Sequence, residues 1–76
     1  MITAEIVKNV AIRFLGEDAD ITVVRSNGGF ANPCGYEITV YTEEGSDSTF
    51  FHDNNTEKTV VSKMIPFVER VENCLS

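Results

Sequence analysis

Few side chains in this sequence could support catalysis. The chain contains a single histidine, His52, and two cysteines, Cys34 and Cys74. A thiolate paired with an imidazole makes a nucleophile, but no third group is evident to orient His52 toward Cys34. His52 and Asp53 are neighbours at the end of an expected strand, where successive side chains point to opposite faces, so we expect no dyad. A thiol-dependent enzyme using Cys34 is the least favoured interpretation.

The spacing of these residues does not indicate a metal or phosphate site either. The cysteines, His52 and Asp53 lack the C-x₂-C and H-x₃-H spacings that are typical of zinc sites. Gly28 and Gly29 lack the lysine and the strand-to-helix context of a phosphate-binding loop. Glu43 and Glu44 alternate across a strand, which does not suit paired-carboxylate catalysis. We therefore predict no catalytic residues, no metal, no cofactor and no enzymatic activity.

Two helices are predicted by apolar spacings of three and four. The first covers residues 3–16, with Thr3 as its N-cap and Gly16 as its stop. A second apolar face runs from Val60 to Leu75, after Asn54 and Glu57, which resemble a capping box. Pro66 lies inside this second helix and lacks the N–H that would bond to Ser62, so we expect a kinked helix or two shorter ones.

Three strands are predicted between the helices, at 20–26, 35–44 and 48–53, with Gly45-Ser46-Asp47 joining the last two. Residues 27–34 form a long loop that exposes Phe30. In the second strand the inward residues Tyr36, Ile38 and Val40 alternate with the outward residues Glu37, Thr39, Tyr41 and Glu43. We expect the inward residues to pack on Val10, Phe14, Val61, Met64 and Val68.

A chain of 76 residues can bury one small core. The order of elements is therefore interpreted as a single α-β-β-β-α domain over residues 1–76. The fold class is α+β: a three-stranded antiparallel meander with the N- and C-terminal helices packed on one face.

Acidic residues are concentrated in the middle of the chain. The formal net charge is −6, but residues 17–53 alone hold eight acidic side chains against Arg25, a net charge of −7. Such a charge keeps a small protein soluble, and grouped on one side it steers association with a basic partner. It disfavours direct binding to nucleic acid or to an anionic membrane, since both need a cationic surface.

The expected compartment is the cytoplasm. No apolar run approaches the roughly 20 residues that cross a bilayer. The first residues, Met1 to Glu5, lack the basic and apolar regions of a signal peptide. In the cytoplasm Cys34 and Cys74 are expected to stay reduced.

The order of elements resembles that of small, acidic, phage-encoded anti-CRISPR inhibitors. The matching parts are the opening helix at 3–16, the acidic meander at 20–53 and the closing helix at 56–75, while the loop at 27–34 departs from the pattern. The resemblance concerns the order of elements and not a sequence motif. It implies a non-catalytic protein in the host cytoplasm that binds a Cas effector and occupies its channel for nucleic acid.

We therefore expect an inhibitor that binds the basic surface of a nucleic-acid-binding protein. Seven residues are the predicted contacts, five as phosphate mimics and two as apolar anchors: Glu37, Glu43, Glu44, Asp47 and Asp53, and then Phe30 and Tyr41. The alternative is a small structural or adaptor subunit that homodimerises through its open sheet face. Ionic strength separates the two, because salt weakens a charge-driven complex but not an apolar dimer.

Overall fold

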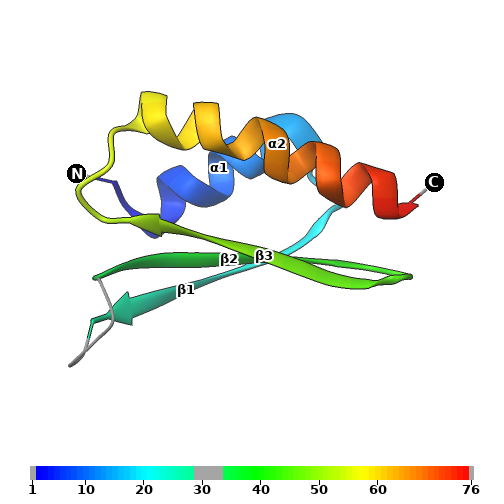
Figure 1. Cartoon of the computed structure of the whole chain (residues 1–76), viewed down its shortest axis with the longest axis horizontal. Helices are drawn as coiled ribbons and strands as arrows, with labels where there is room; N and C mark the ends of the chain where they lie inside the picture. The colour runs from blue at the N-terminus through cyan, green and yellow to red at the C-terminus, as the bar shows by residue number, and fades with distance from the viewer. Residues whose placement is uncertain (1, 29–33, 76) are drawn as a thin grey trace.

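The computed structural model describes residues 2–28 and 34–75. Its elements follow the order α1 (Ala4–Leu15), β1 (Asp20–Asn27), β2 (Cys34–Thr42), β3 (Gly45–His52) and α2 (Glu57–Leu75). The strands form one antiparallel sheet in the order β1-β2-β3. Both helices lie on the same face of this sheet and leave the other face open (Figure 1). The predicted α+β meander with two flanking helices is confirmed.

The first helix begins and ends where its capping residues predict. The Thr3 side chain accepts a hydrogen bond of 3.2 Å from the backbone N–H of Ile6. Gly16 ends the helix at φ 91°, a conformation that favours glycine, and its N–H donates to the Ile12 carbonyl. Ahead of the helix, Ile2 is buried in the core, and its N–H donates to the Asp53 carbonyl.

The second helix differs from its prediction at its N-cap, and at Pro66 the structure excludes one of the two alternatives. Thr56 caps it, because the Thr56 hydroxyl accepts a hydrogen bond of 3.2 Å from the Thr59 N–H, so the assignment of Asn54 as the cap was wrong. The helix also continues through Pro66 and is not split in two. Pro66 and Ser62 are both exposed, so water can satisfy the Ser62 carbonyl that lacks its usual donor.

The β2–β3 turn lies two residues earlier than predicted. Glu43 and Glu44 form the turn, whereas Gly45, Ser46 and Asp47 already belong to β3, with Thr42 paired to Gly45. Gly45 adopts φ 139°, which a residue with a side chain rarely does. The Thr42 hydroxyl accepts a bond from the Glu44 N–H and donates one to the Gly45 carbonyl. These local bonds fix the turn at Glu43 and Glu44.

The strand register decides which residues enter the core. Tyr36 pairs with Phe51, Ile38 with Thr49 and Val40 with Asp47, so these side chains face the helices. Ile38, Val40 and Phe51 are buried, and Tyr36 is half-buried against them. From the helices the core receives Val7, Val10, Ala11, Val60, Met64, Phe67, Val68 and Val71.

Phe14 does not belong to the core, contrary to the prediction. Its side chain is 39% exposed, while its neighbour Leu15 packs against the buried cluster. Val61, another expected core residue, is only half-buried. The apolar residues of α1 cover more than one face of the helix, and only the face of Val7, Val10 and Ala11 meets the sheet and α2.

Candidate protein-binding surface

Five acidic residues meet at one end of the molecule. Glu43 and Glu44 form the β2–β3 turn, and the register pairs Asp20 with Tyr41, which places the α1–β1 loop beside this turn. We call Glu17, Asp18, Asp20, Glu43 and Glu44 the acidic end. All five are exposed, and none forms an ion pair with a residue that the structure describes. Their charges are therefore open to a partner.

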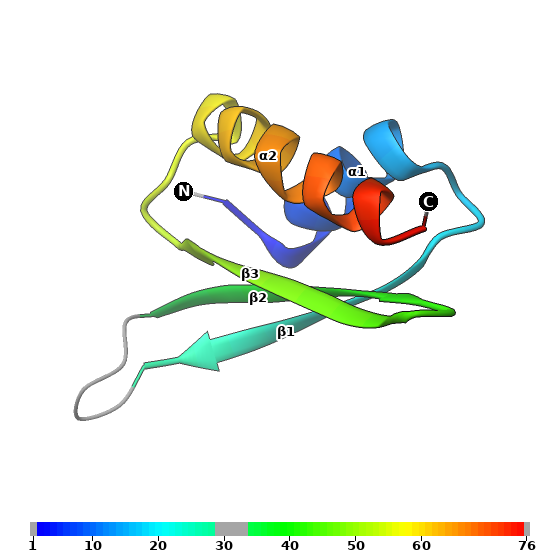
Figure 2. The same ribbon diagram turned by 45° about the vertical axis from the view of Figure 1, so that its right-hand side comes forward.

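Both helices add to the negative potential of this end. Leu15, the last residue of α1, and Val71, near the end of α2, line the same groove as Asp20 and Glu43. Figures 1 and 2 show the last turn of α2 on the same side of the molecule as the β2–β3 turn. A helix carries partial negative charge at its C-terminus, and the last turn of α2 contains no basic residue. Arg13, in the last turn of α1, is paired with Glu57 at 3.5 Å.

The predicted contact residues fall into three groups. Glu43 and Glu44 belong to the acidic end, with Tyr41 beside them and 47% exposed. Glu37 is also exposed but lies further along the open face, opposite Val24 and Phe50. Asp47 and Asp53 are half-buried and engaged in ion pairs. Phe30 lies outside the described residues.

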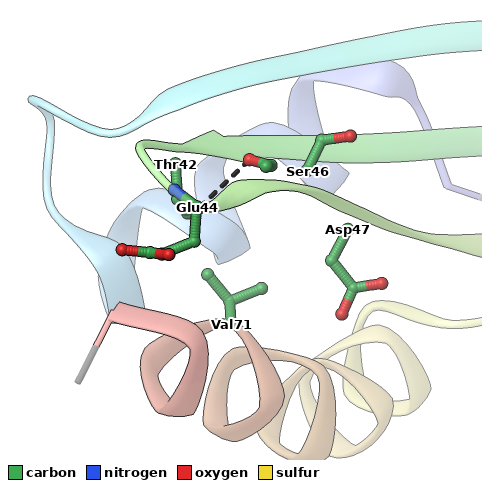
Figure 3. Close-up of a pocket in the computed structure, with 6 residues that line it drawn as sticks. Thr42, Glu44, Ser46, Asp47 and Val71 are labelled. Atoms are coloured by element: carbon green, nitrogen blue, oxygen red, sulfur yellow. Dashed lines mark hydrogen bonds between the residues drawn. The ribbon is translucent and has the colours of Figure 1, made fainter.

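Asp47 joins the sheet to α2. Two nitrogens of the Arg70 guanidinium donate to the two carboxylate oxygens of Asp47, one of them over 3.2 Å, and Arg70 also contacts the Ser48 carbonyl. The Arg70 guanidinium further lies 5.4 Å from the centre of the Phe67 ring. Figure 3 shows Asp47 on the α2 side of the hairpin, whereas Ser46 points away from the helix. The structure therefore gives Asp47 a partner within the fold.

Asp53 and Arg25 pair at the opposite end of the sheet. The Arg25 guanidinium donates to Asp53 over 3.3 Å and lies 4.9 Å from the centre of the Tyr36 ring. This end thus balances its positive and negative charges. The negative excess of residues 17–53 is concentrated at the other end, around the β2–β3 turn.

The Asp47–Arg70 pair makes the free energy of unfolding depend on pH in the acidic range. The hydrogen bonds from Arg70, with its charge and the Ser48 N–H, hold the pKa of Asp47 below its ordinary value of 3.8, although partial desolvation opposes them. A lowered pKa stabilises the fold above the ordinary value, and this contribution is lost as pH falls through the folded-state pKa. We expect Asp47→Asn to flatten the loss of stability below about pH 4 and to cost under about 1 kcal/mol at neutral pH, because solvent reaches both side chains of the pair.

Urea unfolding at several pH values measures this effect. Glu44→Gln is the matched control, since Glu44 is exposed and has no ion-pair partner among the described residues. High salt should shrink the neutral-pH difference between Asp47→Asn and the parent. Parallel acid curves for the parent and Asp47→Asn would show that the pair contributes nothing.

The open face of the sheet has hydroxyl side chains at its centre. Its central row joins Thr22, Thr39 and Ser48, and the next row joins Val24, Glu37 and Phe50. Val24 is 53% exposed, whereas Phe50 is half-buried and meets His52 edge-on, with ring centres 5.3 Å apart. Thr22, Val24 and Phe50 therefore face outward, whereas Phe51 faces the helices.

The residues considered for catalysis lie apart. His52 pairs with Gly35 and shares its face of the sheet, while Cys34, the residue before Gly35, belongs to the opposite face. The Cys34 thiol is exposed. Within residues 2–28 and 34–75, no three acidic, histidine or cysteine side chains are grouped to hold a metal ion. The described helices also include none long and apolar enough to cross a bilayer.

Two concave sites flank the β2–β3 turn. The smaller one lies between the turn and α2, has a volume of about 60 Å³ and is bordered by Thr42, Glu44, Asp47 and Val71 (Figure 3). This volume suits water and not a ligand. The larger one, which we call the hairpin groove, lies between β2 and the α1–β1 loop. It has a volume of about 580 Å³ and includes Leu15, Ala19, Tyr41 and Val71.

The sequence analysis did not include Glu17, Asp18 and Asp20 among the contacts, although it counted their charge. Only the pairing of β1 with β2 brings them next to Glu43 and Glu44. A prediction that placed the turn at Glu43 and Glu44 would have indicated that these acidic residues lie close together. No protein-family model, curated protein or solved structure matches the chain.

Proposed function

We propose that this protein is a non-catalytic inhibitor that binds a basic surface of a nucleic-acid-binding protein. The observation that carries the proposal is the acidic end, where five exposed carboxylates lack an ion-pair partner within the described fold. Like charges that are grouped together repel one another, so such a cluster lowers the stability of the fold unless a partner of opposite charge binds it. Tyr41, which is 47% exposed beside these carboxylates, supplies an apolar anchor.

The carboxylates would take the place of phosphates in a channel that normally holds nucleic acid. Basic channels of this kind attract any dense array of negative charge, and this attraction speeds association. By its resemblance in element order, the protein would act as a phage counter-defence factor in the host cytoplasm, with a Cas effector as its target. Competition for the target's nucleic-acid site is the property that distinguishes an inhibitor from a neutral binder.

Charge reversal at the turn tests the proposal. Glu43→Lys with Glu44→Lys changes the net charge from −6 to −2 and leaves the Asp47–Arg70 pair in place. Because both residues are exposed, folding should survive, at about half a kcal/mol or less for each change. The association rate with a partner captured from a host lysate should fall about tenfold at low salt and respond less to added salt. Surface kinetics at two salt concentrations measure this.

A matched control separates position from total charge. Glu5→Lys with Glu69→Lys makes the same change in net charge on the helices, at exposed positions away from the β2–β3 turn. This control should keep the partner's association rate close to that of the parent. Equal rates for the two double variants would mean that only net charge matters, and an unchanged rate in both would end the proposal.

The homodimer alternative makes a different prediction. A sheet-to-sheet dimer would bury Val24 and Phe50 and would resist salt. The open face is richer in hydroxyl groups than the apolar centre of a stable dimer interface. Sedimentation that shows a dimer at low and high salt, together with no competition for nucleic acid, would favour the adaptor subunit.

A further inference from the structure

The hairpin groove combines an apolar interior with an acidic edge. Edges of Val40 and Val71 form its base, and Leu15 and Ala19 line it from the α1–β1 side. Asp18, Asp20 and Glu43 stand on its border, and none of the described residues that line it is basic. The groove thus places an apolar surface next to a group of carboxylates.

We propose that the hairpin groove binds an arginine side chain presented by the basic partner. This inference rests on the proposed function and names the contact by which the partner is recognised. The aliphatic part of an arginine would cover the half-buried Leu15 and Ala19, while its guanidinium would reach the carboxylates. Charge complementarity and the amphipathic shape of the groove select this occupant.

Arginine fits the groove better than lysine. Its planar guanidinium can donate to two carboxylates at once, and Asp18, Asp20 and Glu43 line the groove together. A lysine ammonium is a compact and strongly hydrated point charge that lacks this planar fork of donors. A bare divalent cation is not favoured, because the described residues form no metal-holding cluster.

Two short peptides, pentaarginine and pentalysine, test the inference with equal charge. Each is titrated at low salt into the isotope-labelled full chain, and the backbone amide signals are followed by NMR. We expect pentaarginine to bind more tightly and to shift the signals of Ala19, Asp20, Tyr41 and Thr42. Signals of Glu37 and Phe50 on the open face should stay in place.

Two kinds of variant separate the groove from its charge. Ala19→Phe fills the groove without changing any charge and should lower pentaarginine affinity several-fold, whereas Thr22→Phe adds the same ring to the open face and should not. Asp18→Asn and Asp20→Asn each remove one carboxylate from the groove and should weaken pentaarginine more than pentalysine, whereas Glu37→Gln on the open face should not. If Ala19→Phe fails to fold, these variants still decide.

The outcomes distinguish the inference from the function on which it rests. Equal affinities for the two peptides, with no effect of Ala19→Phe but a loss on reversing Glu43 and Glu44, would overturn the groove contact. The proposed function would then stand on diffuse charge alone. Failure of both peptides to bind at low salt would overturn the groove contact, and an unchanged partner association rate after charge reversal would overturn the function as well.

Discussion

Truncating Phe51 to alanine is expected to lower the free energy of unfolding by about 3–5 kcal/mol. Phe51 is fully buried, and its register with Tyr36 places it beneath the helices. The cost combines the lost transfer of the ring from water and the cavity that remains. A chain of 76 residues has about 4–11 kcal/mol of stability in total. We therefore expect the variant to melt far below the parent in thermal or urea unfolding.

Phe14→Ala is the matched control, because it removes the same atoms from a different environment. The Phe14 side chain is 39% exposed, so its loss should cost about 1 kcal/mol or less. The sequence analysis placed Phe14 in the core, so it predicted a larger cost for Phe14→Ala than this exposure allows. Equal destabilisation by Phe14→Ala and Phe51→Ala would contradict the core described here.

Gly35→Ala is expected to destabilise the sheet by about 1–3 kcal/mol or more, although it adds only a methyl group. A Cβ atom at Gly35 would lie 2.2 Å from the carbonyl oxygen of Phe51 and 2.7 Å from the Phe50 ring. The oxygen belongs to the backbone of the neighbouring strand, so the clash can be relieved only if the pairing of β2 and β3 shifts. Urea unfolding measures the cost, and the amide signals of His52 report the shift.

A second substitution identifies which contact is responsible. The Phe50 ring is the flexible part of the clash, whereas the Phe51 carbonyl is not. If the backbone contact dominates, Gly35→Ala should cost about as much in a Phe50→Ala background as in the parent. Rescue by Phe50→Ala would instead mean that Gly35 exists to accommodate the ring.

The acidic end could be predicted only in part. The charge excess of residues 17–53 is visible in the sequence, and Glu43 and Glu44 were identified from it, while Tyr41 was identified from the alternation of the second strand. Asp47 was grouped with them because the turn was expected at Gly45-Ser46-Asp47. With the turn at Glu43 and Glu44, Asp47 belongs to the inward row of β3 and pairs with Arg70. Sequence alone could not show this, because the partner lies 23 residues away on α2.

The sequence by itself determined the features that depend on local geometry. Helix and strand periods are set by the backbone, so the helix from Ala4 to Leu15, its caps at Thr3 and Gly16, and the alternation of β2 could be predicted. Tertiary structure decided what depends on register and packing. A shift of one residue turns every side chain of a strand to the other face, and β3 has too little alternation to choose between Phe50 and Phe51. Its pairing with β2 makes that choice, and the same meander gathers the distant carboxylates into one acidic end.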